Sequence, residues 1–407
     1  MPPSPAPSTH QFRSWSEKAE RLTVALLVLF LLGGAAYSWR LGNTLRFLPD
    51  EREYLTLADN LVTYHRYTLD GATLTAYRPP GYVWFLTLLR AAGLRVWQLR
   101  LANFLLFVLT LWGLYRWLKR DHSSLAGAFA VWMAGAYVVL FFTAGTLYPQ
   151  TLAACLLLWS LYLLSAPSPQ PARGIFAGAL FGWTVLTVPL LGIVLPVALL
   201  WGGYFRLPWR ALAAFALVSL LPVALWSARN SRVFGAFVFI STNSGENLLV
   251  GNNENATPNS GTTVDISTYR QTASALDEVS RDRYYRRQAW VYIRQHPLSA
   301  LRLYLLKVLT YFHYRNNLVT TSETSTLRDV VMLLTYAPLL LLGAWRLVAA
   351  WRFPLRPLDW LWGGIYVASA FATALFFPRI RFRLPFDYFL ISLDAAFLAR
   401  WLEMKVR

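Results

Sequence analysis

The chain has 407 residues, of which 56% are hydrophobic, 16% aromatic and only 14% charged. An ordinary soluble domain carries about a quarter charged residues, so this composition argues against a chain built from soluble domains. The apolar residues come in long blocks, and the first block runs from Leu22 to Tyr37 without a charge. The sequence therefore predicts an all-α polytopic membrane protein.

The formal net charge is +18, from 38 Lys and Arg residues against 20 Asp and Glu residues. Such a balance is also typical of nucleic-acid-binding domains, but no folded basic domain stands apart from the apolar blocks. Positive charge on cytoplasmic loops and contact with anionic headgroups account for it, so we expect the lipid bilayer, and no nucleic acid, as partner. The lone Cys155 lies inside an apolar block and can form no intrachain disulfide.

Residues 1–21 are rich in Pro and Ser and end in a basic cluster. Such a composition predicts a disordered cytoplasmic tail. The apolar segment that follows could be a cleavable signal, with small residues at Gly34 and Ala36. It is nevertheless long enough to span the membrane, and many spans follow it, so we expect it to be the first transmembrane helix.

Two apolar segments, residues 82–94 and 298–313, are short or interrupted by charge, which favours interfacial helices over membrane crossings. If both lie flat, the remaining loops place nearly all their Lys and Arg on the cytoplasmic side, as the positive-inside rule requires. The sequence thus predicts about ten transmembrane helices in the cytoplasmic (inner) membrane, with both termini in the cytoplasm. The predicted spans are residues 22–39, 99–117, 125–142, 150–164, 174–188, 190–204, 212–228, 330–350, 358–377 and 384–401.

This topology divides the chain into parts that follow its polar stretches. It brings three of these stretches together on the outer face, at residues 40–100, 229–317 and 378–383. Because long loops in a compact protein are usually functional, we expect the active site on this outer, periplasmic face. The predicted parts are a tail at 1–21, an N-terminal transmembrane module at 22–228 with the first outer loop at 40–100, an outer-face segment at 229–328 with interfacial helices, and C-terminal transmembrane helices at 329–407.

Two carboxylates, Asp50 and Glu51, follow the first span directly after Pro49. A carboxylate at the mouth of a membrane cavity is a candidate functional group, because burial makes its charge costly and shifts its pKa. The same residues are also good capping sequence for a helix that begins near Tyr54. On spacing alone, the two interpretations are equally good.

Arginines recur in two other outer stretches. Tyr77 and Arg78 precede Pro79 and Pro80, which give a rigid start to the interfacial helix and would hold Arg78 at headgroup depth. Arg78 could grip a phosphate bidentately or simply reach for the headgroups. Near the C-terminus three arginines alternate on the predicted outer face, against the positive-inside trend, and an anionic ligand would compensate for their charge. These three are Arg379, Arg381 and Arg383.

The Asp50-Glu51-x-x-Tyr54 string, followed by Tyr77-Arg78-Pro79-Pro80-Gly81-Tyr82, resembles the first outer loop of family 39-type glycosyltransferases. This is the membrane superfamily with the GT-C fold that contains protein O-mannosyltransferases and lipid A aminoarabinose transferases. The resemblance extends over most of the chain and includes the segments 228–230, 244–253, 296–307 and 379–385.

The resemblance implies an enzyme that transfers a hexosyl or pentosyl unit from a polyprenyl-phosphate donor to an acceptor hydroxyl or amine, with inversion. By the same resemblance Asp50 is the base, and Arg78 meets the donor phosphate. We expect Arg379, Arg381 or Arg383 to hold the phosphate together with Arg78. Attack at an anomeric carbon requires a base on one side and charge stabilisation of the leaving phosphate on the other. If the last arginines lie on a helix, only one or two of them can face the ligand. Glu51 is expected to orient the acceptor or an arginine, and Tyr54 and Tyr77 to position the site.

The polar stretch 241–263 is mostly turn chemistry, although Glu246 and Asn247 are candidates for binding sugar or acceptor. Many relatives carry an acidic residue where this chain has Gln150, and Gln150 can neither act as a base nor ligate a metal strongly. The histidines are scattered, so no metal site is predicted, and the sequence leaves dependence on a divalent metal open. No cofactor is expected, and the absence of a Gly-rich dinucleotide loop disfavours a nucleotide-sugar donor.

Two other functions fit the same sequence. A flippase or transporter of lipid-linked sugars could use the arginines for phosphate binding without chemistry, but such proteins tend to show repeated halves with broken helices, which this chain lacks. A GT-C subunit with a structural role is the third interpretation, and the intact Asp50 and Arg78 argue mildly against it. The sugar, the acceptor and the oligomeric state do not follow from the sequence.

Overall fold

A computed structural model describes residues 9–46, 49–167, 170–259, 261–315 and 326–406. Within these ranges the protein is all-helical, and its only strand-like pairing is an isolated bridge between Thr68 and Leu74. The first half of the chain forms α1 (Thr9–Leu41), α2 (Asp50–Tyr64), α3 (Pro80–Ala91), α4 (Val96–Asp121), α5 (Ser124–Ala136), α6 (Val139–Ala144), α7 (Gln150–Leu164), α8 (Pro171–Thr187), the 3-10 turn η1 (Pro189–Ile193) and α9 (Val194–Tyr204). The second half forms α10 (Trp209–Phe234), α11 (Ser244–Gly251), η2 (Gly261–Thr263), α12 (Ser267–Thr272), α13 (Glu278–Gln295), α14 (Pro297–Tyr311), α15 (Thr326–Val348), η3 (Ala349–Trp351), α16 (Pro357–Ala374) and α17 (Ile380–Val406).

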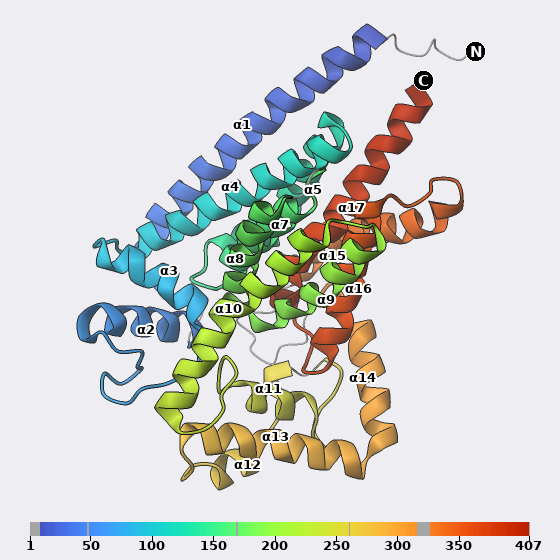
Figure 1. The fold of residues 1–407 in the computed structure, drawn as a ribbon. Helices are drawn as coiled ribbons and strands as arrows, with labels where there is room; N and C mark the ends of the chain where they lie inside the picture. Colours follow the sequence, from blue (N-terminus) through green and yellow to red (C-terminus); the bar gives the residue numbers. More distant parts are fainter. Residues whose placement is uncertain (1–8, 47–48, 168–169, 260, 316–325, 407) are drawn as a thin grey trace.

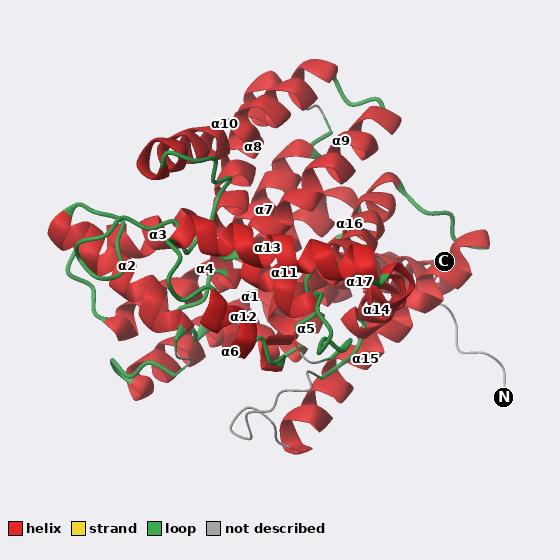
Figure 2. Ribbon diagram, turned by 90° about the horizontal axis from the view of Figure 1, so that it is seen from below, coloured by secondary structure: helices red, strands yellow, loops and turns green. Residues whose placement is uncertain are grey.

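Long helices run side by side in a bundle, and short helices cover one of its ends (Figure 1). We call the end that carries α2 and α11–α13 the loop end. The start of α1 and the end of α17 lie at the opposite end, which we call the terminal end. Seen from the loop end, α11 and α13 lie across the middle of the bundle (Figure 2).

Four segments in the described part of the chain are long and apolar enough to cross a membrane. They are Glu17–Leu41, Val96–Asp121, Trp209–Phe234 and Thr326–Trp351, and three shorter apolar segments accompany them at Ser124–Ala136, Gln150–Leu164 and Pro189–Tyr204. All seven overlap predicted spans. The chain is thus an all-α polytopic membrane protein, and the count of about ten spans stays a prediction.

The last helix, α17, forms the centre of the bundle. All fifteen of its positions from 383 to 397 are buried, whatever side of the helix they face. A helix buried all round must satisfy its polar groups inside the protein. Arg383 and Asp387 do so by pairing with each other at 3.1 Å. The helix packs against α5, α7, α15 and α16, and it contains the span predicted at residues 384–401.

Two expectations about the N-terminal half were wrong. The tail expected at residues 1–21 is helical from Thr9 onward, since α1 begins there, and residues 1–8 lie outside the described ranges. The span expected at 125–142 is broken, because α5 ends at Ala136 and α6 begins at Val139. The break falls at Tyr137, whose buried hydroxyl donates to Asp387 on α17 at 3.1 Å.

One buried lysine fastens the loop end to the bundle. The Nζ of Lys307 on α14 donates to the Gly251 carbonyl at 3.0 Å, to Asn252 Oδ1 at 3.2 Å and to the Phe376 carbonyl at 2.9 Å. These acceptors come from α11 and from the end of α16, so a single ammonium joins three segments. The backbones of α11 and α16 also approach closely, because a Cβ on Gly251 would lie 1.9 Å from the Phe376 oxygen.

We expect the Lys307→Met variant to be less stable than the wild type by about 3 kcal/mol, since it leaves buried carbonyls without a donor. The measurement is thermal unfolding of the purified protein in detergent. The control is Lys18→Met, which removes an exposed ammonium. Equal midpoints for the two variants would show that the Lys307 ammonium contributes nothing to docking of the loop end.

Candidate active site at the loop end

The first turn of α2 carries three acidic residues, Asp50, Glu51 and Glu53. Acidic side chains favour the positive end of a helix dipole, which explains why the helix begins here. Residues three and four apart share a helix face, so Asp50, Glu53 and Tyr54 point one way and Glu51 points another. The side chain of Asp50 does not cap the helix, because its hydrogen bonds go to side chains from elsewhere.

Asp50 is held between two arginines. One carboxylate oxygen accepts from Arg78 at 2.6 Å and the other from Arg381 at 2.5 Å. The three side chains are only 14 to 27% exposed. Burial alone would raise the pKa of the Asp50 carboxyl, but Arg381 and Arg78 outweigh it and hold that pKa below its ordinary value. Asp50 is therefore ionised at neutral pH in the unliganded protein.

Arg78 is shared between two carboxylates and two aromatic rings. Its Nε donates to Glu53 at 2.7 Å, on the same face of α2 as Asp50. Its guanidinium lies 5.3 Å from the centroid of the Tyr54 ring and 5.2 Å from that of Tyr77. Burial raises the pKa of Tyr77 to about 12, so both rings act as neutral walls around the arginine. Tyr54 and Tyr77 thus both contact Arg78, and their role in positioning the site stays a prediction.

Arg381 reaches the same carboxylate from the other end of the chain. It lies in the first turn of α17, and its guanidinium is 5.4 Å from the centroid of Tyr148 and 5.2 Å from that of Phe382. Tyr148 belongs to the short connection between α6 and α7. The structure therefore brings Asp50, Arg78 and Arg381 into one cluster from three segments that are distant in sequence, and we call these three residues the Asp50 cluster.

Glu51 does not belong to this cluster. It is fully buried, and its oxygens accept from the Arg46 backbone N–H at 2.6 Å and from that of Leu147 at 2.8 Å. Its hydrogen bonds tie the first outer loop to the connection that carries Tyr148. Glu51 therefore fixes the position of the connection from which Tyr148 contacts Arg381. Its role in orienting an acceptor or a neighbouring arginine stays a prediction.

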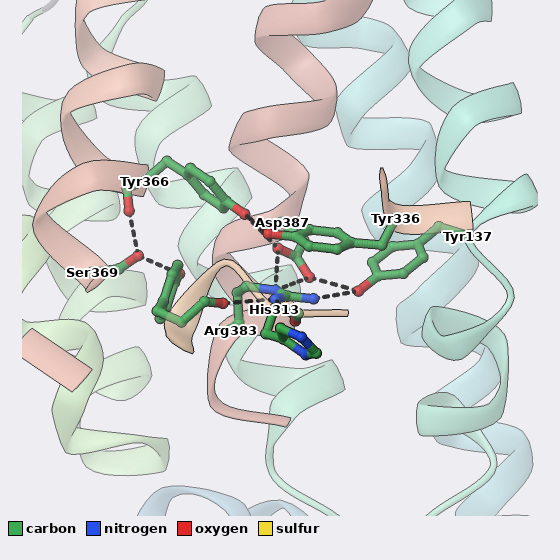
Figure 3. Close-up of polar contacts among 8 residues, drawn as sticks. Tyr137, His313, Tyr336, Tyr366, Ser369, Arg383 and Asp387 are labelled. Atoms are coloured by element: carbon green, nitrogen blue, oxygen red, sulfur yellow. Dashed lines mark hydrogen bonds and ion pairs between the residues drawn. The ribbon is translucent and has the colours of Figure 1, made fainter. Parts of the chain in front are cut away.

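Arg383 faces the interior of the bundle and not the Asp50 cluster. Figure 3 shows it in a polar network with Asp387, Tyr137 and the carbonyl of His313. It is 1% exposed, and its guanidinium lies 3.6 Å from the centroid of the Tyr336 ring. Residues two apart on a helix point to nearly opposite sides, so Arg381 and Arg383 cannot serve the same ligand. Arg383 also lines a small cavity together with Arg379, so its role in binding a donor phosphate stays a prediction.

Arg379 lies neither in the Asp50 cluster, as Arg381 does, nor in the buried network around Asp387, as Arg383 does. It precedes α17, and its guanidinium donates to Thr262 at 3.2 Å. It also lines a small cavity of about 10 Å³ together with Asn259 and His313. Arg379 therefore lies at the loop end, where it contacts Thr262, and its role in binding phosphate stays a prediction.

Glu246 and Asn247 lie half-buried on α11, at the same end of the molecule. Glu246 pairs with Arg270 at 2.8 Å. Its charge also acts on the Tyr77 hydroxyl, whose pKa is raised first by burial and further by Glu246. The roles of Glu246 and Asn247 in binding sugar or acceptor stay predictions.

Glu278 is a site residue that the sequence analysis missed. Its carboxylate accepts from Thr75 Oγ1 at 2.7 Å and from the Ala76 N–H at 2.8 Å, immediately before Tyr77 and Arg78. It also accepts from the Thr242 hydroxyl, and the Thr242 N–H donates to the Ala76 carbonyl at 3.0 Å. Glu278 therefore clamps the Arg78 loop to α13. The sequence signal is weak, because an acid in the first turn of a helix is usually only a dipole partner.

We expect Glu278→Gln to lower the transfer activity proposed for this site, since an amide cannot accept all three hydrogen bonds and the Arg78 loop shifts. A misplacement of about 1 Å can cost ~100-fold in rate. The assay compares kcat and KM with those of Glu254→Gln, an exposed acid that only bonds Tyr269. A loss of activity at an unchanged melting temperature supports a positioning role, and parallel losses of activity and stability would contradict it.

In the described ranges, no three His, Cys, Asp or Glu side chains come together as a metal site requires. Dependence on a divalent metal, which the sequence leaves open, is not decided by this observation. At the Asp50 cluster, two guanidiniums face two carboxylates, because Arg78 pairs with Glu53 as well as with Asp50.

The chain matches no model of a known protein family and no curated protein. Among solved structures it is similar to ArnT from Cupriavidus metallidurans bound to undecaprenyl phosphate, at 16% identity and a TM-score of 0.44, over 91% of this chain and 77% of that one. It is also similar to the apo state of the same protein, at 16% identity and a TM-score of 0.42, over 92% and 78% of the two chains. Likeness at this level carries no argument about activity, so the function is argued from the geometry of the Asp50 cluster.

Proposed function

We propose that this protein is an inverting GT-C glycosyltransferase, which moves a hexosyl or pentosyl unit from a polyprenyl-phosphate carrier to an acceptor hydroxyl or amine. The reaction takes place at the outer face of the cytoplasmic membrane, where we place the loop end. The observation that carries the proposal is the Asp50 carboxylate held between Arg78 and Arg381. This arrangement offers a base, Asp50 at the start of α2, in direct contact with two anion-binding guanidiniums.

Phosphate binding and base activation are coupled in this geometry. In the unliganded protein, N–H groups of Arg78 and Arg381 form ion pairs with Asp50 and Glu53. A donor phosphate would take over some of these N–H groups, because charge-assisted bidentate bonds to phosphate are strong. Asp50 would then lose part of its stabilisation beside a new negative charge, and its pKa would rise. The carboxylate becomes a stronger base only when the donor is in place.

The acceptor proton passes to Asp50 while the acceptor oxygen or nitrogen attacks the anomeric carbon. The bond from that carbon to the phosphate oxygen breaks, and the carrier leaves as a phosphate anion held by Arg78 and Arg381. A phosphate leaves without a general acid, so one carboxylate is sufficient. Glu53 is bound to Arg78 and serves as the counterion that keeps this arginine in place when Asp50 turns to the acceptor.

The coupling predicts a shift between two pH profiles. A general base must be deprotonated, so activity is present above its pKa and is lost as the pH falls through it. The acid limb of kcat/KM reports the free enzyme, in which two arginines depress the pKa of Asp50. The acid limb of kcat reports the donor complex and is expected at a higher pH. Coincident limbs would show that donor binding leaves Asp50 unchanged.

The proposal is tested with purified protein in proteoliposomes, cell-envelope extract as the source of acceptor, and a panel of radiolabelled polyprenyl-phosphate sugars. Transfer of label from one donor, with inversion of the anomeric configuration, supports the enzyme. Donor binding and movement of the donor across the bilayer, without transfer from any donor, would replace it by a flippase or transporter. Retention of configuration would contradict the single-base mechanism.

A further inference from the structure

A second cavity lies at the terminal end, far from the Asp50 cluster. It has a volume of about 530 Å³ and opens between α1, α4 and α7. Figure 1 shows α1 and α4 side by side at this end, opposite to α11–α13. Nothing in the proposed reaction uses this space.

The cavity is charged at one end and apolar at the other. On α1 its lining runs from Glu20 to Leu27, and on the antiparallel α4 from Lys119 to Trp112. Seven residues of helix span about 10 Å. The lining therefore changes from ionic to hydrocarbon-like over about 10 Å, which is the change that a phospholipid makes between its phosphate and the first methylenes of its acyl chains.

The charged end has an excess of positive charge. Lys119 forms an ion pair with Glu20 at 2.7 Å, and Arg120 forms one with Asp121 at 2.7 Å. Arg116 also lines the cavity, where its guanidinium lies 5.5 Å from the centroid of the Trp112 ring. Arg116 makes no ion pair within the described part of the chain, so it is the cation that an anionic ligand would meet first.

We propose that this cavity binds an anionic glycerophospholipid, with the headgroup phosphate at Arg116 and Lys119 and an acyl chain along Val24 and Leu27. The apolar half of the lining favours a lipid over a free phosphate, which would leave that half wetted or empty. A net anionic headgroup fits the net positive charge of this end, where three cations stand against the two carboxylates of Glu20 and Asp121. The site is independent of the proposed transfer reaction, because it lies at the other end of the bundle.

The test uses native mass spectrometry of the purified, delipidated protein with phosphatidylglycerol or phosphatidylcholine added at equal concentration. The wild type is expected to bind phosphatidylglycerol more tightly. Because one basic residue near an anionic lipid is worth about 1 kcal/mol, Arg116→Gln should weaken this binding by about fivefold. This change breaks no ion pair, so the fold is retained.

Two further variants test whether lipid binding takes place in this cavity or at exposed arginines in general. Arg210→Gln is the matched control, since Arg210 is also exposed and lies 5.7 Å from the centroid of a tryptophan, Trp209, but does not line the cavity. Val24→Trp fills the apolar end and should weaken lipid binding while leaving Arg116 intact. The proposal is overturned if phosphatidylcholine binds equally well, if Arg210→Gln has the same effect as Arg116→Gln, or if inorganic phosphate displaces the lipid at equal concentration.

Discussion

Replacing Asp50 by Asn is expected to abolish sugar transfer while donor binding persists. A positioned general base contributes about 10²- to 10⁴-fold to rate, so kcat should fall by at least ~100-fold. Asn has nearly the same shape, but its NH2 group cannot accept from either guanidinium. Arg78 and Arg381 lose a competing carboxylate, so the donor should bind as tightly as to the wild type or more tightly. Transfer and equilibrium donor binding are measured on the same preparation.

The matched control is Asp59→Asn. Asp59 lies on the same helix, α2, and pairs with Arg90 of α3 at 2.6 Å, but it is more exposed and does not touch the Asp50 cluster. The control should keep wild-type kcat. A variant Asp50→Asn that retains more than a tenth of the activity would rule out Asp50 as the base.

Replacing Arg381 by Gln is expected to lower the affinity for the donor. Truncating one member of a partly buried, hydrogen-bonded charge pair costs roughly 2–5 kcal/mol, so Arg381→Gln should weaken donor binding by at least about 30-fold. The variant also leaves one oxygen of Asp50 without its arginine, which raises the pKa of that carboxyl in the free protein. The acid limb of kcat/KM should therefore move to higher pH along with the loss of affinity.

Arg381→Lys is expected to recover only part of the affinity, because an ammonium cannot present a planar pair of donors to phosphate. Arg90→Gln serves as control, since it breaks the Asp59 pair on the same pair of helices α2 and α3. Unchanged donor affinity in Arg381→Gln, measured by titration with polyprenyl phosphate, would remove Arg381 from the binding site.

The sequence predicts the main members of the site because their signals are local. Asp50 and Arg78 stand in one outer loop, and Pro80 does start a helix at the first position of α3. Arg381 comes from a stretch whose positive charge breaks the positive-inside trend. The resemblance to a known family assigned both stretches to one site, although Asp50 and Arg381 are 331 residues apart in sequence. In the structure these two side chains form a hydrogen bond.

Residues whose role depends on direction were harder to predict. Glu51 stands next to Asp50 in sequence, yet a helix turns by about 100° per residue, so its carboxylate meets buried backbone N–H groups instead of Arg78 or Arg381. The sequence analysis also did not single out Glu53, which stands among several charged residues. Its spacing of three residues from Asp50 places it on the same helix face, and this spacing is the signal that could have found it. Arg383 differs from Arg381 in the same way, and Asp387 one turn later is the sign of its inward pairing.

Long-range packing accounts for the remaining differences. The break between α5 and α6 cannot be read from an apolar string, because it depends on where Tyr137 meets α17. The clamp by Glu278 joins residues about 200 positions apart through short polar loops that carry no periodic signal. Propensity and hydropathy are local quantities, so they predict the helices and leave these contacts open.

Photolabelling of the site by the carrier lipid tests the central claim most directly. A polyprenyl phosphate analogue with a diazirine next to the phosphate is bound to the protein in nanodiscs, irradiated, and its attachment sites are mapped by peptide sequencing. We expect labels on the peptides that carry Tyr54, Tyr77 and Tyr148, removed by excess unlabelled polyprenyl phosphate and reduced in Arg381→Gln. Competable labelling confined to the terminal end, with none around Asp50, would contradict the account.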